Sequence, residues 1–147
     1  WGWISDIKGY RYTREHPVTG EPWAAMPEII RTSAMNLAEA YGYSLILQTC
    51  LLNYYPAGGK LGLHQDNSEK NQTAPIISFS LGDDAVFAIG GLRRSDPTRE
   101  IILRSGDALI MGSEARMAFH GVKKILAGTS NLLRNGGRIN FTIRQYE

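Results

Sequence analysis

Cysteine and histidine are both scarce in this sequence. Its 147 residues include one cysteine, Cys50, and three histidines. A single cysteine excludes an internal disulfide and any cysteine-based zinc site, and it fits a reducing compartment. Cys50 lies in an apolar stretch, which favours a buried structural thiol. A metal site built on imidazole therefore has few candidate ligands in this chain.

Long hydrophobic runs and a strong net charge are also absent. No apolar run approaches the ~20 residues of a membrane span, and no signal-peptide pattern opens the chain. These absences predict a cytoplasmic protein without a membrane partner, and we expect a monomer. The chain begins at Trp1 rather than at Met, so we expect residues before it in the full protein. The net charge of +2 excludes little, although a basic C-terminal half could attract phosphate or carboxylate ligands.

What is present is enough for one well-packed domain. Hydrophobic residues make up 43% of the chain and aromatic residues 10%, which excludes a disordered protein. Helical spacing of apolar residues after Pro27, ended by Gly42, predicts a helix. Period-two patterns then predict strands at 45–55, 75–81, 85–89, 100–104, 108–111, 117–122 and 138–146.

The predicted strands imply the fold class. Short strands separated by turn residues are typical of an all-β sandwich or barrel. The turn at 82–84 predicts that strands 75–81 and 85–89 form a hairpin, and the aromatic-rich N-terminal segment 1–26 reads as irregular structure or a short hairpin. We therefore predict a mainly β protein, a jelly roll with one N-terminal helix packed against it.

The first chemical signal is the pair His64 and Asp66. Positions i and i+2 of an extended strand project from one face, so these side chains can converge on one point. An imidazole and a carboxylate are two-thirds of a facial triad for Fe(II). His120, in an apolar strand, is a better third ligand than His16, which lies in a proline-flanked loop. A surface His–Asp pair and a hydrogen-bonded core histidine would explain the same residues.

The second signal is the strict alternation of the last strand. Arg138, Asn140, Thr142 and Arg144 share one face, and Ile139, Phe141 and Ile143 share the other. If the apolar face packs inward, the polar face is simply solvated, as in many sheets. If the polar face points inward, its arginines need an anionic ligand such as a dicarboxylate. The alternation by itself leaves both arrangements open.

Taken together, these residues resemble a known family. The combination consists of Leu52-Asn53-Tyr54-Tyr55-Pro56, then Leu61-Gly62-Leu63-His64-Gln65-Asp66, then His120, and finally Arg138-x-Asn140-x-x-x-Arg144. In this order it is similar to the AlkB family of Fe(II)- and 2-oxoglutarate-dependent dioxygenases, and the resemblance extends over nearly the whole chain. It implies a double-stranded β-helix.

The resemblance also implies the cofactors and the residues that bind them. His64, Asp66 and His120 would hold Fe(II), leaving three positions for 2-oxoglutarate and O2. Arg138 would bind the distal carboxylate of 2-oxoglutarate, and Asn53, Tyr55, Asn140 and Arg144 would complete its pocket. The residues expected to contact the nucleic acid are Trp3, which would stack on a flipped base, Tyr10 and Leu61.

The expected activity is oxidative demethylation of N-alkylated bases such as 1-methyladenine and 3-methylcytosine in DNA. The same chemistry on RNA, notably tRNA, is the alternative; a zinc hydrolase or a metal-free binding module fits less of the motif set. Ser68 stands where bacterial repair members tend to carry an acidic residue, which leaves the base preference open. We expect residues 1–147 to form the catalytic domain without part of an N-terminal nucleotide lid.

Overall fold

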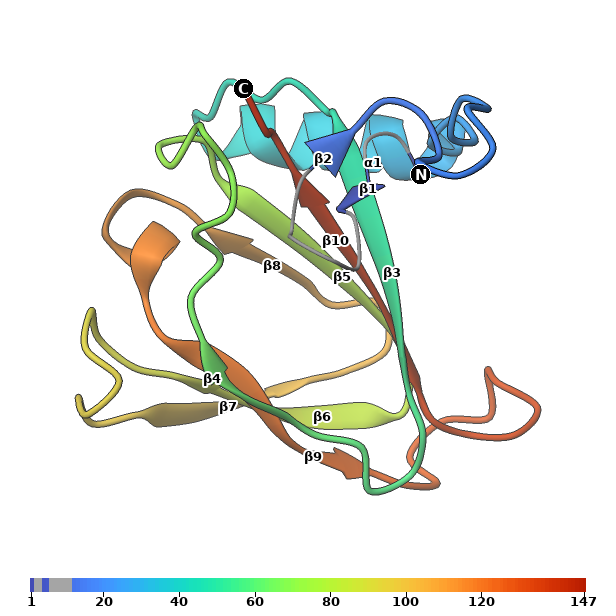
Figure 1. Cartoon of the computed structure of the whole chain (residues 1–147). Coiled ribbons are helices and arrows are strands. Elements are labelled where there is room, and N and C mark those ends of the chain that lie inside the picture. The colour runs from blue at the N-terminus through green and yellow to red at the C-terminus, as the bar shows by residue number, and fades with distance from the viewer. Residues whose placement is uncertain (2–3, 6–11) are drawn as a thin grey trace.

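Two antiparallel four-stranded sheets form the body of the protein. The computed structural model describes residues 1, 4–5 and 12–147. Figure 1 shows the sheets as two layers that enclose a common interior. The strand order is β3-β10-β5-β8 in one sheet and β4-β9-β6-β7 in the other. This pair of interleaved sheets confirms the predicted double-stranded β-helix.

The strands of the first sheet are β3 (Thr49–Tyr55), β10 (Arg138–Arg144), β5 (Ile76–Gly82) and β8 (Ala108–Met111). Those of the second are β4 (Leu61–His64), β9 (His120–Leu126), β6 (Asp84–Ile89) and β7 (Arg99–Leu103). A short 3₁₀ helix, Ser113–Met117, connects β8 to β9. In the N-terminal segment, β1 (Ile4–Ser5) pairs antiparallel with β2 (Tyr12–Thr13), consistent with the short hairpin considered for this region.

The predicted helix forms as α1 (Glu28–Ala40) and covers the outer face of the first sheet (Figure 1). Pro27 precedes it, and Gly42 follows it with φ of 74°, a value that glycine adopts without strain. Ala34 and Ala38 are its buried residues, and their small side chains pack in one cluster with the sheet residues Cys50, Ile77 and Ile143. No helix in the described part of the chain is long and apolar enough to cross a membrane.

The structure shows which face of β10 points into the protein interior. Ile143 is fully buried in the cluster beneath α1, so the apolar face of β10 looks outward toward the helix. The polar face looks into the space between the sheets, where Arg138, Asn140, Thr142 and Arg144 are all buried and line one cavity. The helix covers the apolar face, and the polar face therefore forms part of the interior.

A second apolar cluster fills the rest of the space between the sheets. Its buried members include Ile76 and Met111 from the first sheet and Phe87, Val122 and Ile125 from the second. These side chains join the two layers beside the polar face of β10. The interior is thus divided into a hydrophobic core and a polar cavity.

Three strand predictions need correction. β5 and β6 are not a hairpin: β5 pairs with β10 and β8, and β6 pairs with β7 and β9 in the other sheet. Only Asp83 separates them, whereas the tightest common hairpins need two loop residues. The strand expected from residue 45 begins at Thr49, and the one expected from 117 begins at His120, because the 3₁₀ helix occupies the preceding residues.

The crossing between the sheets is stabilised by Asp83. Its side chain is buried, and its two carboxylate oxygens accept hydrogen bonds from the backbone N–H of Ser130 at 3.0 Å and of Gly137 at 2.8 Å. The bond from Gly137 is the main cause that holds the pKa of Asp83 below its usual range. The carboxylate thereby anchors the loop that leads into β10.

Replacing Asp83 by Asn is expected to lower the free energy of unfolding at pH 7 by about 1–3 kcal/mol, because an amide cannot accept both bonds. Since the folded-state pKa of Asp83 is depressed, its stabilisation is present above the unfolded pKa of about 3.9 and is lost as the pH falls below it. Urea titrations of both proteins over this pH range measure the difference. Asp84→Asn, which removes a carboxylate without a hydrogen bond in the described structure, is the control; an equal loss in both variants would contradict the assignment.

Candidate active site

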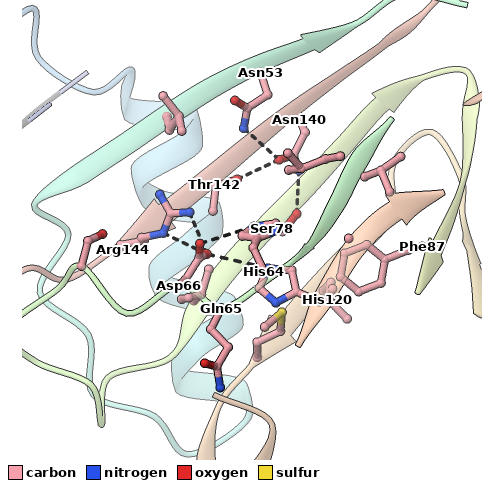
Figure 2. A pocket seen from close by; sticks show the side chains of 18 of the residues that line it. Asn53, His64, Gln65, Asp66, Ser78, Phe87, His120, Asn140, Thr142 and Arg144 are labelled. Atoms are coloured by element: carbon pink, nitrogen blue, oxygen red, sulfur yellow. Dashed lines mark hydrogen bonds and ion pairs between the residues drawn. The ribbon is translucent and has the colours of Figure 1, made fainter. Parts of the chain in front are cut away.

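Three potential metal ligands meet at the open end of the second sheet. His64 is the last residue of β4 and pairs in register with His120, the first residue of β9; Asp66 follows His64 by two residues. Figure 2 shows the three side chains pointing toward one another. One ligand atom from each lies within 4.8 Å of the others, and no other such group of His, Cys, Asp or Glu occurs among residues 1, 4–5 and 12–147.

Both histidines are oriented by their main-chain contacts. The Nδ1 of His64 lies 2.9 Å from the Gly62 carbonyl oxygen, and the Nδ1 of His120 lies 3.0 Å from that of Ala118. A carbonyl only accepts, so each Nδ1 carries the proton and each Nε2 presents its lone pair. The Nε2 atoms lie 3.6 and 3.9 Å from the oxygens of Asp66. Fixing the tautomer in this way is typical of metal-ligating histidines.

The electrostatic environment keeps these groups in the forms that bind cations. Burial lowers the pKa of His120, so its imidazole is neutral at pH 7. Burial would raise the pKa of Asp66, but Arg144 and the two histidines outweigh it and hold that pKa below the usual range. Arg144 donates from Nε at 3.2 Å and from Nη2 at 2.7 Å, both to Oδ2 of Asp66. The other oxygen, Oδ1, lies toward His64.

This donor set fits Fe(II). Two neutral imidazole nitrogens and one carboxylate oxygen on one side of a point form the two-histidine, one-carboxylate arrangement of non-haem iron enzymes. His64 is one-third exposed, and Asp66 and His120 are nearly buried, so the point is reached from one direction. The ring of Phe87 stacks on His120 at 5.7 Å between centroids and covers the inner side.

A cavity of about 580 Å³ extends from the three ligands between the sheets. Arg138 lines it, the residue is 2% exposed, and burial lowers its pKa. Arg138 Nη2 donates to Ser80 Oγ at 2.8 Å, but Nε has no partner, and no described carboxylate forms an ion pair with this side chain. An unpaired buried charge is costly, so Arg138 could bind an anion in the cavity. A dicarboxylate such as 2-oxoglutarate meets that requirement.

The other predicted cosubstrate residues lie along the same wall. Asn140 donates to Ser78 Oγ at 2.6 Å and to the Phe79 carbonyl, while its own carbonyl accepts from Thr142 at 2.7 Å (Figure 2). Asn53 donates weakly to the same oxygen at 3.5 Å. The ring of Tyr55 lies 5.5 Å from the Arg138 guanidinium. Asn140 is thus satisfied within the protein and braces three strands, whereas Arg144 is engaged by Asp66.

The residues predicted to contact nucleic acid are less fully described. Leu61, at the start of β4, lines the cavity and is 43% exposed, as a residue at its mouth should be. Ser68 also lines the cavity, and its hydroxyl donates to Glu69 at 3.3 Å. Trp3 and Tyr10 lie outside the described residues.

Sequence reasoning missed several residues that hold this site. Gln65 lies between two ligands but turns away from them, and its amide donates to the Met117 carbonyl at 2.6 Å. Glu69 and Arg116 form a buried ion pair next to Asp66. The one sequence signal for these residues was the position of Glu69, three residues after Asp66. The sequence does not show which charged side chains are buried, so the ion pair could not be predicted.

Comparison with known proteins agrees with this geometry. Residues 1–144 match the 2OG-Fe(II) oxygenase superfamily. The "Alpha-ketoglutarate-dependent dioxygenase AlkB homolog" of Caulobacter vibrioides is 47% identical over 144 residues, which is 98% of this chain and 64% of that protein. The chain belongs to the AlkB family of 2OG-Fe(II) oxygenases. It spans about two-thirds of the length of the AlkB relatives that it matches.

Other members of the family are similar over part or all of the chain. The solved structure of OsALKBH1 superposes with a TM-score of 0.83 at 32% identity, covering 98% of this chain and 75% of that one. The "DNA N(6)-methyladenine demethylase ALKBH1D" of Arabidopsis thaliana is 43% identical over 107 residues, 66% of this chain and 24% of that protein. The "tRNA demethylase abh1" of Schizosaccharomyces pombe is 38% identical over 109 residues, 67% and 36% of the two chains.

His120→Ala is expected to weaken metal binding by more than about a hundred-fold, because a ligand is lost rather than a supporting contact. Anaerobic calorimetric titration with Mn(II), which accepts the same ligands, measures this affinity. The matched control is His16→Ala, which removes the third histidine, located in a loop outside the cluster. Equal affinities in the wild type and the His120 variant would exclude this residue as a ligand.

Arg138→Met is expected to leave the free energy of unfolding unchanged or to raise it, because the guanidinium has no ionic partner among the described residues. In contrast, the Kd for 2-oxoglutarate should rise about thirty-fold or more, through loss of a buried charge pair. Denaturant titration and equilibrium binding give the two values. The exposed Arg99→Met is the control, and a variant that binds 2-oxoglutarate normally would refute the role.

Proposed function

We propose that this chain is the catalytic domain of an oxidative demethylase that removes methyl groups from N-alkylated nucleic-acid bases. The observation that carries the proposal is the presence, in one cavity, of three convergent metal ligands and an unpaired buried arginine. A hydrolytic zinc site would use the ligands but would have no need for a buried anion receptor. Membership of the AlkB family supports nucleic-acid bases as the substrates.

When bound, Fe(II) with 2-oxoglutarate and O2 supplies the oxidation that converts an N-methyl group to N-hydroxymethyl, with succinate and CO2 as the products of 2-oxoglutarate. The hydroxymethyl adduct then breaks its C–N bond to release formaldehyde and the free base. In this scheme His64, Asp66 and His120 hold the metal, and Arg138 binds the distal carboxylate. Tyr55 and Asn53 line the same cavity.

The apolar part of the cavity has a separate role. Ile76, Phe87 and Val122 line it with apolar side chains. Excluding water protects an oxidising centre from side reactions and directs it to the methyl group. By resemblance, Trp3 would stack on the flipped base, Tyr10 would contact the backbone, and Leu61 would border the entrance.

The preferred polymer is DNA, with bases such as 1-methyladenine and 3-methylcytosine. RNA is the second candidate, favoured by the match to a protein named as a tRNA demethylase. The two differ in the 2′-hydroxyl, which an enzyme must contact to discriminate between them.

Turnover of matched DNA and RNA oligonucleotides tests both candidates. Each carries one 1-methyladenine, 3-methylcytosine or N6-methyladenine, and succinate and formaldehyde are measured together. We expect equal amounts of the two products, oxygen dependence, faster turnover of DNA, and none above background in His120→Ala. Faster turnover of RNA would replace the DNA assignment, and succinate release that no methylated oligonucleotide stimulates would refute the function.

A further inference from the structure

A buried charge cluster lies directly behind the metal ligand Asp66. The side chain of Glu69 is fully buried and that of Arg116 is 2% exposed, yet neither residue lines the cavity. Their ion pair joins Glu69 Oε2 to Arg116 Nη2 at 3.2 Å. Burying two charges is energetically costly even when they are paired. A buried ion pair at this position therefore suggests a specific role in the site.

The cluster contacts Asp66 from two sides. Arg116 donates from Nη1 to the main-chain carbonyl of Asp66 at 2.6 Å, and from Nε to that of Ala74 at 2.8 Å. Arg144 donates to the side chain of Asp66, and its Nε lies 3.5 Å from Glu69 Oε1. The carboxylate of Glu69 therefore contacts both arginines, and the arginines together hold the backbone and the carboxylate of Asp66.

The four charged side chains around Asp66 have no net charge. Arg116 and Arg144 are cations, and Asp66 and Glu69 are anions. Without Glu69, Arg116 would have no carboxylate partner among the described residues, and Arg144 would depend on the carboxylate of Asp66 alone. Because Glu69 partners both arginines, Asp66 can keep Oδ1 directed at His64 while Oδ2 stays on Arg144, 3.9 Å from His120 Nε2.

Glu69 also reaches the opposite wall of the site. Tyr12, in β2, donates from its hydroxyl to Glu69 Oε1 at 2.5 Å, and its side chain lines the cavity. Burial raises the pKa of Tyr12 to about 12, so the hydroxyl remains a donor at neutral pH. The carboxylate of Glu69 thus accepts hydrogen bonds from β2 and from the 3₁₀ helix, and it forms an ion pair with Arg144 of β10.

We propose that Glu69 is a positioning residue of the iron site: through Arg144 and Arg116 it holds Asp66 in the geometry that binds the metal. This inference rests on the proposed function for the identity of the metal. Its mechanism is purely geometric, since Glu69 itself lies outside the cavity. Supporting groups of this kind are worth about ten- to a hundred-fold in metal affinity.

The test measures Mn(II) affinity anaerobically in Glu69→Gln, which keeps the shape and removes the charge. We expect the affinity to fall about ten- to a hundred-fold. The Mn(II) electron paramagnetic resonance spectrum of the saturated variant should also change, because the Asp66 carboxylate is less constrained. Glu114→Gln, an exposed glutamate two residues from Arg116, is the matched control and should behave as wild type.

A second variant covers the case in which Glu69→Gln folds poorly. Replacing both members of the buried pair, Glu69→Met with Arg116→Met, leaves no unpaired charge and is expected to fold. If Glu69 only offsets the charge of Arg116, this double variant regains wild-type affinity. If it positions Asp66, the affinity stays reduced, because Arg144 has lost its contact with Glu69 and the main chain of Asp66 has lost its contact with Arg116.

Wild-type affinity and an unchanged spectrum in either folded variant would overturn the inference. This failure is distinguishable from failure of the proposed function. A wild-type enzyme that demethylates normally, with variants that bind Mn(II) normally, refutes only the role of Glu69. A wild-type protein that shows no turnover, with variants that lose Mn(II) affinity, refutes only the function.

Discussion

The ion pair between Arg144 and Asp66 connects the two sheets at the point where the metal ligands meet. Arg144 is the last residue of β10 in one sheet, and Asp66 follows β4 of the other, 78 positions away in the chain. In the interior such a pair is favourable only when its remaining hydrogen-bonding groups are satisfied. Arg116 and Glu69 meet that condition, and Figure 2 shows Arg144, Asp66 and His64 as one continuous group.

Arg138, at the other end of the polar face of β10, contrasts with Arg144. Arg144 has a carboxylate partner within the protein, whereas Arg138 has none among the described residues and retains an unpaired Nε. One strand therefore carries one arginine that is paired with Asp66 and one that has no carboxylate partner among the described residues. A buried arginine without an ionic partner lowers the free energy of unfolding, and the packing of the two apolar clusters offsets this loss. Such a balance between stability and function is common in proteins.

Much of the secondary structure followed from local pattern, whereas the pairing of the strands did not. Helix α1 was predictable because Pro27, Gly42 and apolar spacing act within a few residues. The false hairpin of β5 with β6 arose because strand pairing is decided by partners distant in sequence. A period-two pattern locates a strand and its faces, but it does not say in which sheet the strand lies.

The sequence by itself determined the kinds of ligand and their order, because His64, Asp66, His120 and the β10 arginines form a motif readable without coordinates. It left open which face of β10 points inward. The tertiary structure decided that question, since α1 packs on Ile143 and leaves the polar face inside. The tertiary structure also decided the contact between Glu69 and Arg116, which are 47 positions apart in the chain. A buried ion pair of this kind depends on which distant segments pack together, not on local sequence.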